Sequence, residues 1–228
     1  MTIRLASPNE YPKHFPPQAW HVLPAAIESA VQAAFAELVE NPSAGETEAD
    51  NFLKRNPALL GQCLNFTNFG HHGTWVVPQK LVDPGANTVR KGKKPDYLLG
   101  GKNSDGFHWC VVELKSPNEK LFKKSASGVA FSATANEGIC QLIQYIDYCS
   151  ANQSFMRDHF KLNEFREPRG FLVLGREAEL DQDPELQELR SAWNRLSGGR
   201  LMIRSYDAIL RSNTSSWGQV EHGYHNEG

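Results

Sequence analysis

The stretch KKPDYLLGGKNSDGFHWCVVELKSP, residues 93–117, holds two apolar runs separated by the turn-forming segment GGKNSDG. This pattern predicts two neighbouring β-strands joined by a tight connection. The second run ends in Glu113 and Lys115, which share one face because side chains two apart on a strand point the same way. A buried acid and base are costly unless they pair or bind an ion. Asp96 starts the first strand, and a hairpin-like connection can bring it beside Glu113.

The segments around this stretch predict one main domain of mixed α/β (α+β) class. A chain of 228 residues with 40% hydrophobic content can bury one substantial core. Periodic apolar residues and turn signals predict the element order α-α-β-β-β-α-β-α-β-α, with the first three strands as an antiparallel meander. The expected helices fall in 23–42, 45–61, 135–152, 183–199 and 205–212, and the expected strands in 74–82, 94–101, 107–115, 169–175 and 200–206.

Charge is concentrated near the same stretch. The formal net charge of the whole chain is only -2. Residues 90–124 nevertheless hold nine Lys or Arg against four acids. A local basic segment of this kind can face an anion while the protein stays near neutral.

The acids, the lysine and the basic flank fit phosphodiester hydrolysis. Two carboxylates and a backbone carbonyl supply the hard oxygen ligands that Mg²⁺ accepts. The metal would activate a water, and the ammonium of Lys115 would orient that water or stabilise developing charge. An ordinary ion pair at a sheet edge is the alternative interpretation of Glu113 and Lys115. The basic residues expected to hold a nucleic-acid backbone are Arg90, Lys91, Lys93, Lys94, Lys120, Lys123 and Lys124.

These residues resemble the PD-(D/E)xK nuclease superfamily, whose signature would be Pro95-Asp96 followed by Glu113-Leu114-Lys115. One branch carries Gln-x-x-x-Tyr on the next helix, which Gln141 and Tyr145 would supply, although both can equally be the polar shoulder of that helix. The order of the pieces looks most like the nuclease domain of Shedu antiphage proteins. The segments that carry this likeness, within residues 46–211, are FLKRNPALL, KPDYLL, VVELKSP, QLIQY, GFLVLGR and SYDAIL.

The resemblance implies a restriction-endonuclease-like αβββαβ core with a mixed sheet flanked by helices. It implies that Asp96 and Glu113 bind Mg²⁺ or Mn²⁺ and that Lys115 is the catalytic lysine. Gln141 would lie at the edge of the active site, supported by Tyr145. Such nucleases often add a helix carboxylate; Glu48 is the preferred candidate because it lies one turn before Phe52, with Glu46 nearly as good.

The expected function is therefore a metal-dependent DNA endonuclease of bacterial antiphage defence. The alternative is an inactive module of the same fold that binds nucleic acid or a protein partner. The resemblance also implies a homo-oligomer. It leaves open what activates the enzyme, whether a regulatory protein binds it and which form of DNA it takes. The roles of residues 1–22 and of His71 and His72 also stay open. The expected divisions are an arm and helix over 1–45, the nuclease-like domain over 46–212 and a polar tail over 213–228.

The sequence also suggests a soluble, cytoplasmic protein. No run of 18 apolar residues and no apolar leader is present, so no membrane association is expected. The four cysteines form no C-x-x-C pair, which favours buried free thiols over a disulfide or a zinc site.

Overall fold

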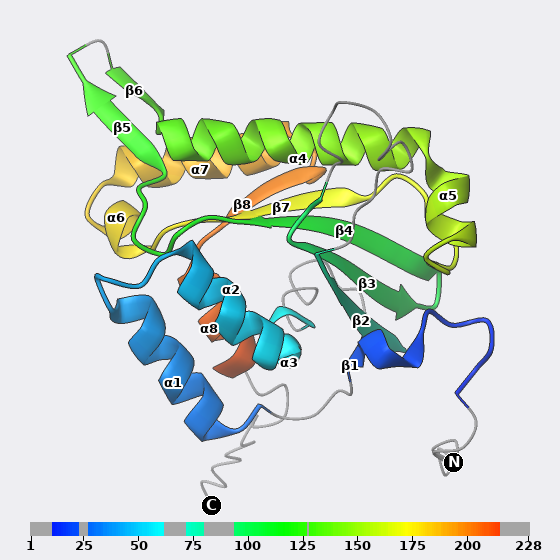
Figure 1. The fold of residues 1–228 in the computed structure, drawn as a ribbon. Helices are drawn as coiled ribbons and strands as arrows, with labels where there is room; N and C mark the ends of the chain where they lie inside the picture. Colours follow the sequence, from blue (N-terminus) through cyan, green and yellow to red (C-terminus); the bar gives the residue numbers. More distant parts are fainter. Residues whose placement is uncertain (1–10, 23–26, 62–71, 80–93, 127, 215–228) are drawn as a thin grey trace, which may run out of the picture.

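The computed structural model describes residues 11–22, 27–61, 72–79, 94–126 and 128–214. A mixed sheet lies between two layers of helices (Figure 1). The first half contains η1 (Gln18–Trp20), β1 (His21–Val22), α1 (Ser29–Glu40), α2 (Glu46–Arg55), α3 (Pro57–Gly61), β2 (Gly73–Pro78), β3 (Tyr97–Asn103) and β4 (Gly106–Leu114). The second half contains β5 (Phe122–Ser125), β6 (Gly128–Phe131), α4 (Ala133–Ala151), α5 (Gln153–Asp158), β7 (Arg169–Val173), α6 (Ala178–Asp181), α7 (Pro184–Leu196), β8 (Leu201–Arg204) and α8 (Tyr206–Thr214).

The main sheet has six strands in the order β1-β2-β3-β4-β7-β8. Strands β1 to β4 pair antiparallel, which confirms the predicted meander, whereas β7 and β8 run parallel to β4. The segment 169–175 was predicted to be a central strand, and β7 lies between β4 and β8. The predicted mixed α/β class with a helix-flanked sheet is therefore confirmed.

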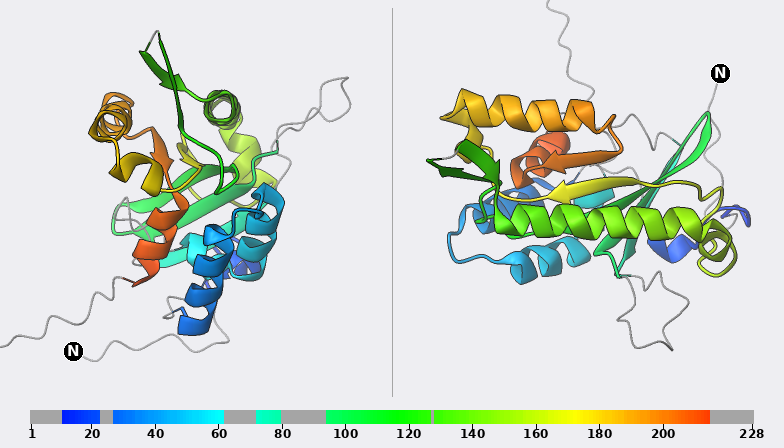
Figure 2. Two further views of the ribbon diagram at one scale, coloured as in Figure 1. Left: turned by 90° about the vertical axis from the view of Figure 1, so that its left-hand side faces the viewer. Right: turned by 90° about the horizontal axis from the view of Figure 1, so that it is seen from above.

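Side chains along β4 alternate between two hydrophobic cores. Trp109 and Val111 pack into the core that α4 and α7 cover. Cys110, Val112 and Leu114 pack into the core on the opposite face, against α1, α2, α3 and α8. Figures 1 and 2 show these two helical layers on either side of the sheet. Because both faces of β4 are covered, a charged residue at its end enters a largely dry environment.

The structure adds elements that the sequence pattern did not predict. Part of the N-terminal arm forms β1 and extends the sheet, and Phe15 makes edge contacts with Trp75 and Phe107. The loop expected after Lys115 contains the separate two-stranded sheet β5–β6. Short helices α5 and α6 are also additional, and α8 extends two residues past the expected end of the domain, with 215–228 outside the described residues.

Two expectations about burial were wrong. The apolar periodicity of 135–152 predicts a buried face made of Ile139, Leu142, Ile143 and Ile146, but Ile143 is 52% exposed because the stripe that contacts the sheet is narrower than that pattern. Cys110 and Cys149 are buried free thiols as expected, whereas Cys140 is exposed, and Cys63 lies outside the described residues. None of the helices in the described part of the chain is long and apolar enough to span a membrane.

Candidate active site

Asp96 and Glu113 lie at adjoining ends of β3 and β4. The last paired positions are Tyr97 and Val112, so Asp96 and Glu113 each lie one residue beyond that pair. An antiparallel register places such residues opposite each other and on the same face. The half-buried Asp96 carboxylate accepts a hydrogen bond from the Leu114 backbone N–H at 2.8 Å. The two carboxylates therefore occupy one end of the sheet, on the face that α4 covers.

Lys115 forms a buried ion pair with Glu113. Its Nζ lies 3.0 Å from Glu113 Oε1, and the two residues are only 7% and 4% exposed. The backbone of Lys115 is fixed at both ends, because its N–H donates to the Val173 carbonyl and its carbonyl accepts from the Tyr206 hydroxyl at 2.8 Å. The position of the ammonium is thus set by strand pairing and by α8.

Glu46, and not the preferred candidate Glu48, lies beside this pair. Glu46 Oε2 is 4.0 Å from Lys115 Nζ. Glu48 instead accepts a hydrogen bond from the Gly45 backbone N–H at 2.9 Å and is exposed. The physical reason is that a Glu in the first turn can reach back to an unpaired N–H at the helix start. The structure thus corrects the expected position of Glu48 in favour of the open alternative.

Sequence reasoning missed two further acids near the site. Asp50 follows Glu46 by one turn of α2, and its negative charge contributes to raising the pKa of Asp96. Glu137 precedes Gln141 by one turn of α4, and its charge contributes to raising the pKa values of Glu46 and Lys115. The helical spacing was a usable signal in both cases, since residues four apart share a face.

Burial and repulsion by neighbouring acids raise the pKa values of these carboxylates. The pKa of Glu113 is raised to about 7, first by burial and then by the charge of Asp96, with Lys115 acting in the opposite direction. Burial also raises the pKa of Asp96 despite its hydrogen bond from Leu114, and the pKa of Glu46 despite the charge of Lys115. A bound cation would favour the charged forms of all three groups.

Helix α4 presents Gln141 and Tyr145 on the side of the carboxylates. The Oε1 atom of Gln141 is buried and has no hydrogen-bond partner among the described residues. The pKa of the half-buried Tyr145 is raised to about 12 by burial and by the charges of Glu113 and Asp96. Tyr145 is therefore close enough to feel the charges of the two carboxylates, and the roles of Gln141 and Tyr145 stay predictions.

A hydrogen-bond network around Asp50 and Gln79 holds the backbone of Asp96 in place. Asp50 accepts hydrogen bonds from the Tyr97 hydroxyl at 2.7 Å and from Gln79 Nε2 at 3.3 Å. The Gln79 backbone N–H donates to the Asp96 carbonyl at 2.7 Å. These bonds connect α2, which carries Glu46, to the strands that carry the central carboxylates.

The donor set suits a cation that keeps most of its water. No group of three or more His, Cys, Asp or Glu suited to a metal occurs within 11–22, 27–61, 72–79, 94–126 or 128–214. Asp96 and Glu113 remain as a pair, and each has one carboxylate oxygen without a hydrogen bond to another described residue. Mg²⁺ is commonly held by one or two carboxylates with several waters, so the pair fits that ion better than a fully protein-ligated metal.

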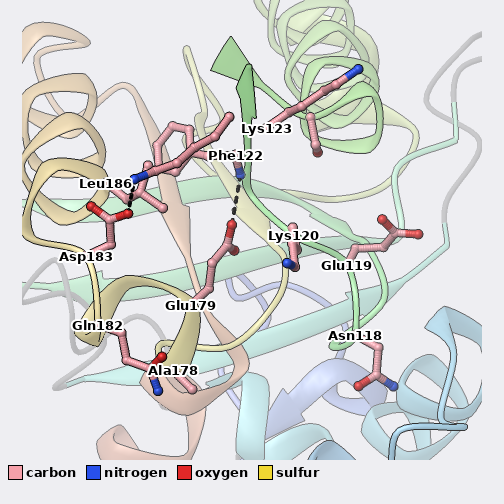
Figure 3. A pocket seen from close by; sticks show the side chains of 12 residues that line it. Asn118, Glu119, Lys120, Phe122, Lys123, Ala178, Glu179, Gln182, Asp183 and Leu186 are labelled. Atoms are coloured by element: carbon pink, nitrogen blue, oxygen red, sulfur yellow. Dashed lines mark hydrogen bonds and ion pairs between the residues drawn. The ribbon is translucent and has the colours of Figure 1, made fainter. Parts of the chain in front are cut away.

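The predicted phosphate-binding lysines occupy different settings. Lys91 and Lys93, together with Arg90, lie outside the described residues, and Lys94 is exposed two residues before Asp96. Lys120, Lys123 and Lys124 line a cavity of about 860 Å³ between the β5–β6 hairpin and α6–α7 (Figure 3). Lys124 forms ion pairs with Asp183 and Glu185 across this cavity, so its charge is partly compensated.

Replacing Glu46 is expected to affect the site more than replacing Glu48. Glu46→Gln should reduce DNA cleavage about 10-fold or more, because a carboxylate beside the ion pair is lost. Glu48→Gln should leave cleavage near the wild-type rate and cost at most about 1 kcal/mol of stability through a weaker helix start. Initial rates of the two matched variants, with thermal melting as the folding control, measure this difference. A larger loss of cleavage rate in Glu48→Gln than in Glu46→Gln would contradict the assignment of Glu46 to the site.

Tyr206→Phe is expected to lower the free energy of unfolding by about 1–3 kcal/mol, because it leaves the buried Lys115 carbonyl without a donor. Urea unfolding of the variant measures the effect. Tyr145→Phe is the matched control, since the Tyr145 hydroxyl makes no hydrogen bond to another described residue and its loss should change stability much less. Equal stability of Tyr206→Phe and wild type would contradict the assigned hydrogen bond.

Comparison with known proteins extends this description. No curated protein matches the chain. Among protein families, residues 43–210 match the one described as Shedu protein SduA, C-terminal. That range includes α2, both motif strands, α4 and most of α8. The chain therefore belongs to the Shedu family, and residues 43–210 match the C-terminal part of Shedu protein SduA.

Proposed function

We propose that the chain is a metal-dependent nuclease that hydrolyses phosphodiester bonds in DNA, with Mg²⁺ or Mn²⁺ as cofactor, in antiphage defence. The observation that carries the proposal is the convergence of Asp96, Glu113 and Lys115 at one end of the sheet, with the lysine ammonium 3.0 Å from a ligand-type carboxylate. Membership of the Shedu family is compatible with this activity.

Asp96 and Glu113 would hold the cation through the oxygen atoms that make no hydrogen bond to described residues. The bound cation would neutralise charge on the phosphate and lower the pKa of a water. In the hydrolysis, a bond forms between water oxygen and phosphorus, the ester P–O bond breaks, and the leaving oxygen takes up a proton. The chain itself supplies a fixed ammonium, Lys115, to orient the water and to stabilise charge that develops on the phosphate.

Gln141 would give the site a second positioning group. Its buried Oε1 accepts no hydrogen bond from the described residues, and buried acceptors are normally satisfied. A water or a phosphate-bound hydroxyl that donates to this oxygen would complete the set and fix the direction of attack.

The test is cleavage of plasmid and linear DNA by purified protein with Mg²⁺, with Mn²⁺ and with chelator. The double variant Asp96→Asn/Glu113→Gln, purified in parallel, controls for contaminating nucleases. Cleavage that requires metal and is absent in the variant supports the proposal. Equal cleavage by wild type and variant, or cleavage undiminished by chelator, overturns it.

A second candidate function is a non-cutting module of the same fold. It is favoured because the described residues contain no group of three or more His, Cys, Asp or Glu that could hold a metal ion. This alternative predicts DNA affinity that falls with salt, does not depend on divalent metal and is accompanied by no cleavage in the same assay.

A further inference from the structure

The β5–β6 hairpin is separate from the main sheet, although Phe122 at its base packs into the core that α4 and α7 cover. It forms its own two-stranded sheet, joined to the site at both ends: five residues, 117–121, separate it from the Ser116 that follows the motif lysine, and α4 begins directly after it. Figures 1 and 2 show it projecting past the start of α4. The hairpin is therefore connected directly to β4 and α4, which carry the candidate catalytic groups.

The base of the hairpin is firmly anchored. The Glu179 carboxylate accepts from the Leu121 and Phe122 backbone N–H groups at 2.8 and 3.2 Å. The Phe122 ring stacks on Phe131, with centroids 5.2 Å apart, and Phe131 makes an edge contact with Trp193 at 5.1 Å. A two-stranded hairpin alone is marginally stable in water, so these contacts are what hold it in a fixed direction.

The outer part of the hairpin is largely exposed, although Val129 packs against the core. Lys123, Ser125, Ala126, Gly128 and Ala130 are all exposed. The described residues at the tip are small, which keeps the ribbon thin, and a side chain added at Gly128 would meet no atom within 4 Å. An anchored base with an exposed, slender tip indicates a partner outside the chain.

The two faces of the ribbon differ in charge. Phe122, Phe131 and Lys124 face α7, where Lys124 pairs with Asp183. Lys123 points to the opposite face, because neighbouring strand residues alternate, and Figure 3 shows it directed away from Asp183. Lys123 makes no ion pair to another described residue. The charge of Lys123 is therefore not compensated by an ion pair to a described residue, and it can approach a phosphate backbone.

We propose that the β5–β6 hairpin enters a groove of double-stranded DNA and holds the duplex against the site, with Lys123 on a flanking phosphate. The dimensions agree: the major groove, about 12 Å wide and 8.5 Å deep, admits a two-stranded ribbon. The four residues of β5 span roughly 13 Å at the usual strand rise. The inference rests on the proposed nuclease function and adds to it that duplex is preferred over single-stranded DNA.

The test shortens the ribbon and keeps its base. Residues 124–129 are replaced by Asn-Gly, which closes a two-residue turn between Lys123 and Ala130, a pair in the present register. Fluorescence anisotropy with Ca²⁺ in place of Mg²⁺ gives the Kd for a short duplex and for one of its strands. The expected result is a loss of roughly tenfold or more in duplex affinity with little change for the single strand. In the full-length hairpin, Lys123→Ala should lower the salt slope of duplex binding by about 1, and Lys161→Ala, an exposed lysine beyond α5, should not.

The outcomes separate this inference from the proposed function. Equal losses of affinity for duplex and single strand, or no loss for either, overturn the proposed role of the hairpin and do not bear on metal-dependent cleavage. A wild-type protein that does not cleave DNA, but whose duplex affinity still depends on the ribbon, overturns the nuclease and supports the ribbon. Circular dichroism of the shortened variant checks that the domain stays folded.

Discussion

Lys115→Ala is expected to reduce DNA cleavage by about 10²–10³-fold or more, the range found when one preorganised electrostatic group is removed from a site. Lys115 is 7% exposed and its ammonium lies 3.0 Å from Glu113, so water cannot easily take the place of this charge. Initial rates with saturating Mg²⁺ on linear DNA measure the loss. A rate within threefold of wild type, taken as roughly equal, would remove Lys115 from the mechanism.

The same variant is expected to be less stable, which has to be separated from catalysis. Removing one partner of a buried ion pair typically costs about 3–5 kcal/mol, because the other charge is left without compensation. The double variant Glu113→Gln/Lys115→Met avoids this cost, since two neutral side chains of similar shape replace both charges. It should melt near the wild-type temperature and still not cleave. A double variant with full activity would contradict both roles, while a folded and inactive one excludes misfolding as the cause.

The central part of the fold could be predicted because local signals there agree with the tertiary structure. Apolar runs bounded by Pro, Gly and Asn gave β2, β3, β4 and β7, and Asp183 with Pro184 fixed the start of α7. Once the meander is recognised, the register alone places Asp96 opposite Glu113. The pair therefore follows from local sequence and one topological assumption.

The hairpin could not be predicted in the same way. In LFKKSASGVAF, only Phe122 and Phe131 mark an apolar face, and they do so at the two ends. The lysines and small residues between them are equally typical of a loop. The Glu179 carboxylate holds the start of β5 in place. Glu179 lies 57 residues after Phe122 in the chain, so the sequence near the hairpin gives no sign of this contact.

The choice between Glu46 and Glu48 depended on a local competition. Residues that are two apart on an α-helix point in directions about 200° apart, so only one of Glu46 and Glu48 can face the site. Glu48 is three residues after Gly45, the spacing at which a Glu returns to the first free N–H. That signal is present in the sequence, and it outweighs the argument from the inward face of Phe52. Asp50 and Glu137 share helix faces with Glu46 and Gln141, but how near those faces lie to the site depends on how α2 and α4 pack on the sheet.

The metal-free protein is expected to lose stability as the pH rises from about 5 to 8, and Glu113 is the main cause. Its pKa is raised from 4.5 to about 7 in the folded state, so the folded chain binds this proton more tightly than the unfolded chain. A carboxyl of this kind stabilises the fold at low pH, and the contribution is lost as the pH rises through the folded value. The size is on the order of 1–3 kcal/mol. Glu113→Gln removes the titration, so its stability should change less over the same range in urea unfolding.

The raised pKa values of Asp96 and Glu46 change stability in the same direction as Glu113, but both groups are present in both proteins. The pKa values of His21 and His108 are lowered by burial, so these residues favour the folded state as the pH rises, in the opposite direction, but they are common to both variants. The lowered pKa values of Glu177 and Asp207 act below the pH range considered. The difference between wild type and Glu113→Gln therefore reports the Glu113 carboxyl. Parallel pH profiles for the two proteins would show that this carboxyl is already ionised near pH 5.

Mg²⁺ is expected to restore the stability that the metal-free protein loses as the pH rises, and to do so more strongly at pH 8 than at pH 6. A ligand carboxylate must be deprotonated, so a pKa of about 7 for Glu113 weakens metal binding about tenfold at pH 6 relative to pH 8. Melting temperatures measured against Mg²⁺ concentration at the two pH values give the apparent affinities. Asp96→Asn should abolish the metal effect at both. An Mg²⁺ affinity that is independent of pH, or a shift that survives in Asp96→Asn, would mean that the cation binds elsewhere and that the buried acids serve the fold alone.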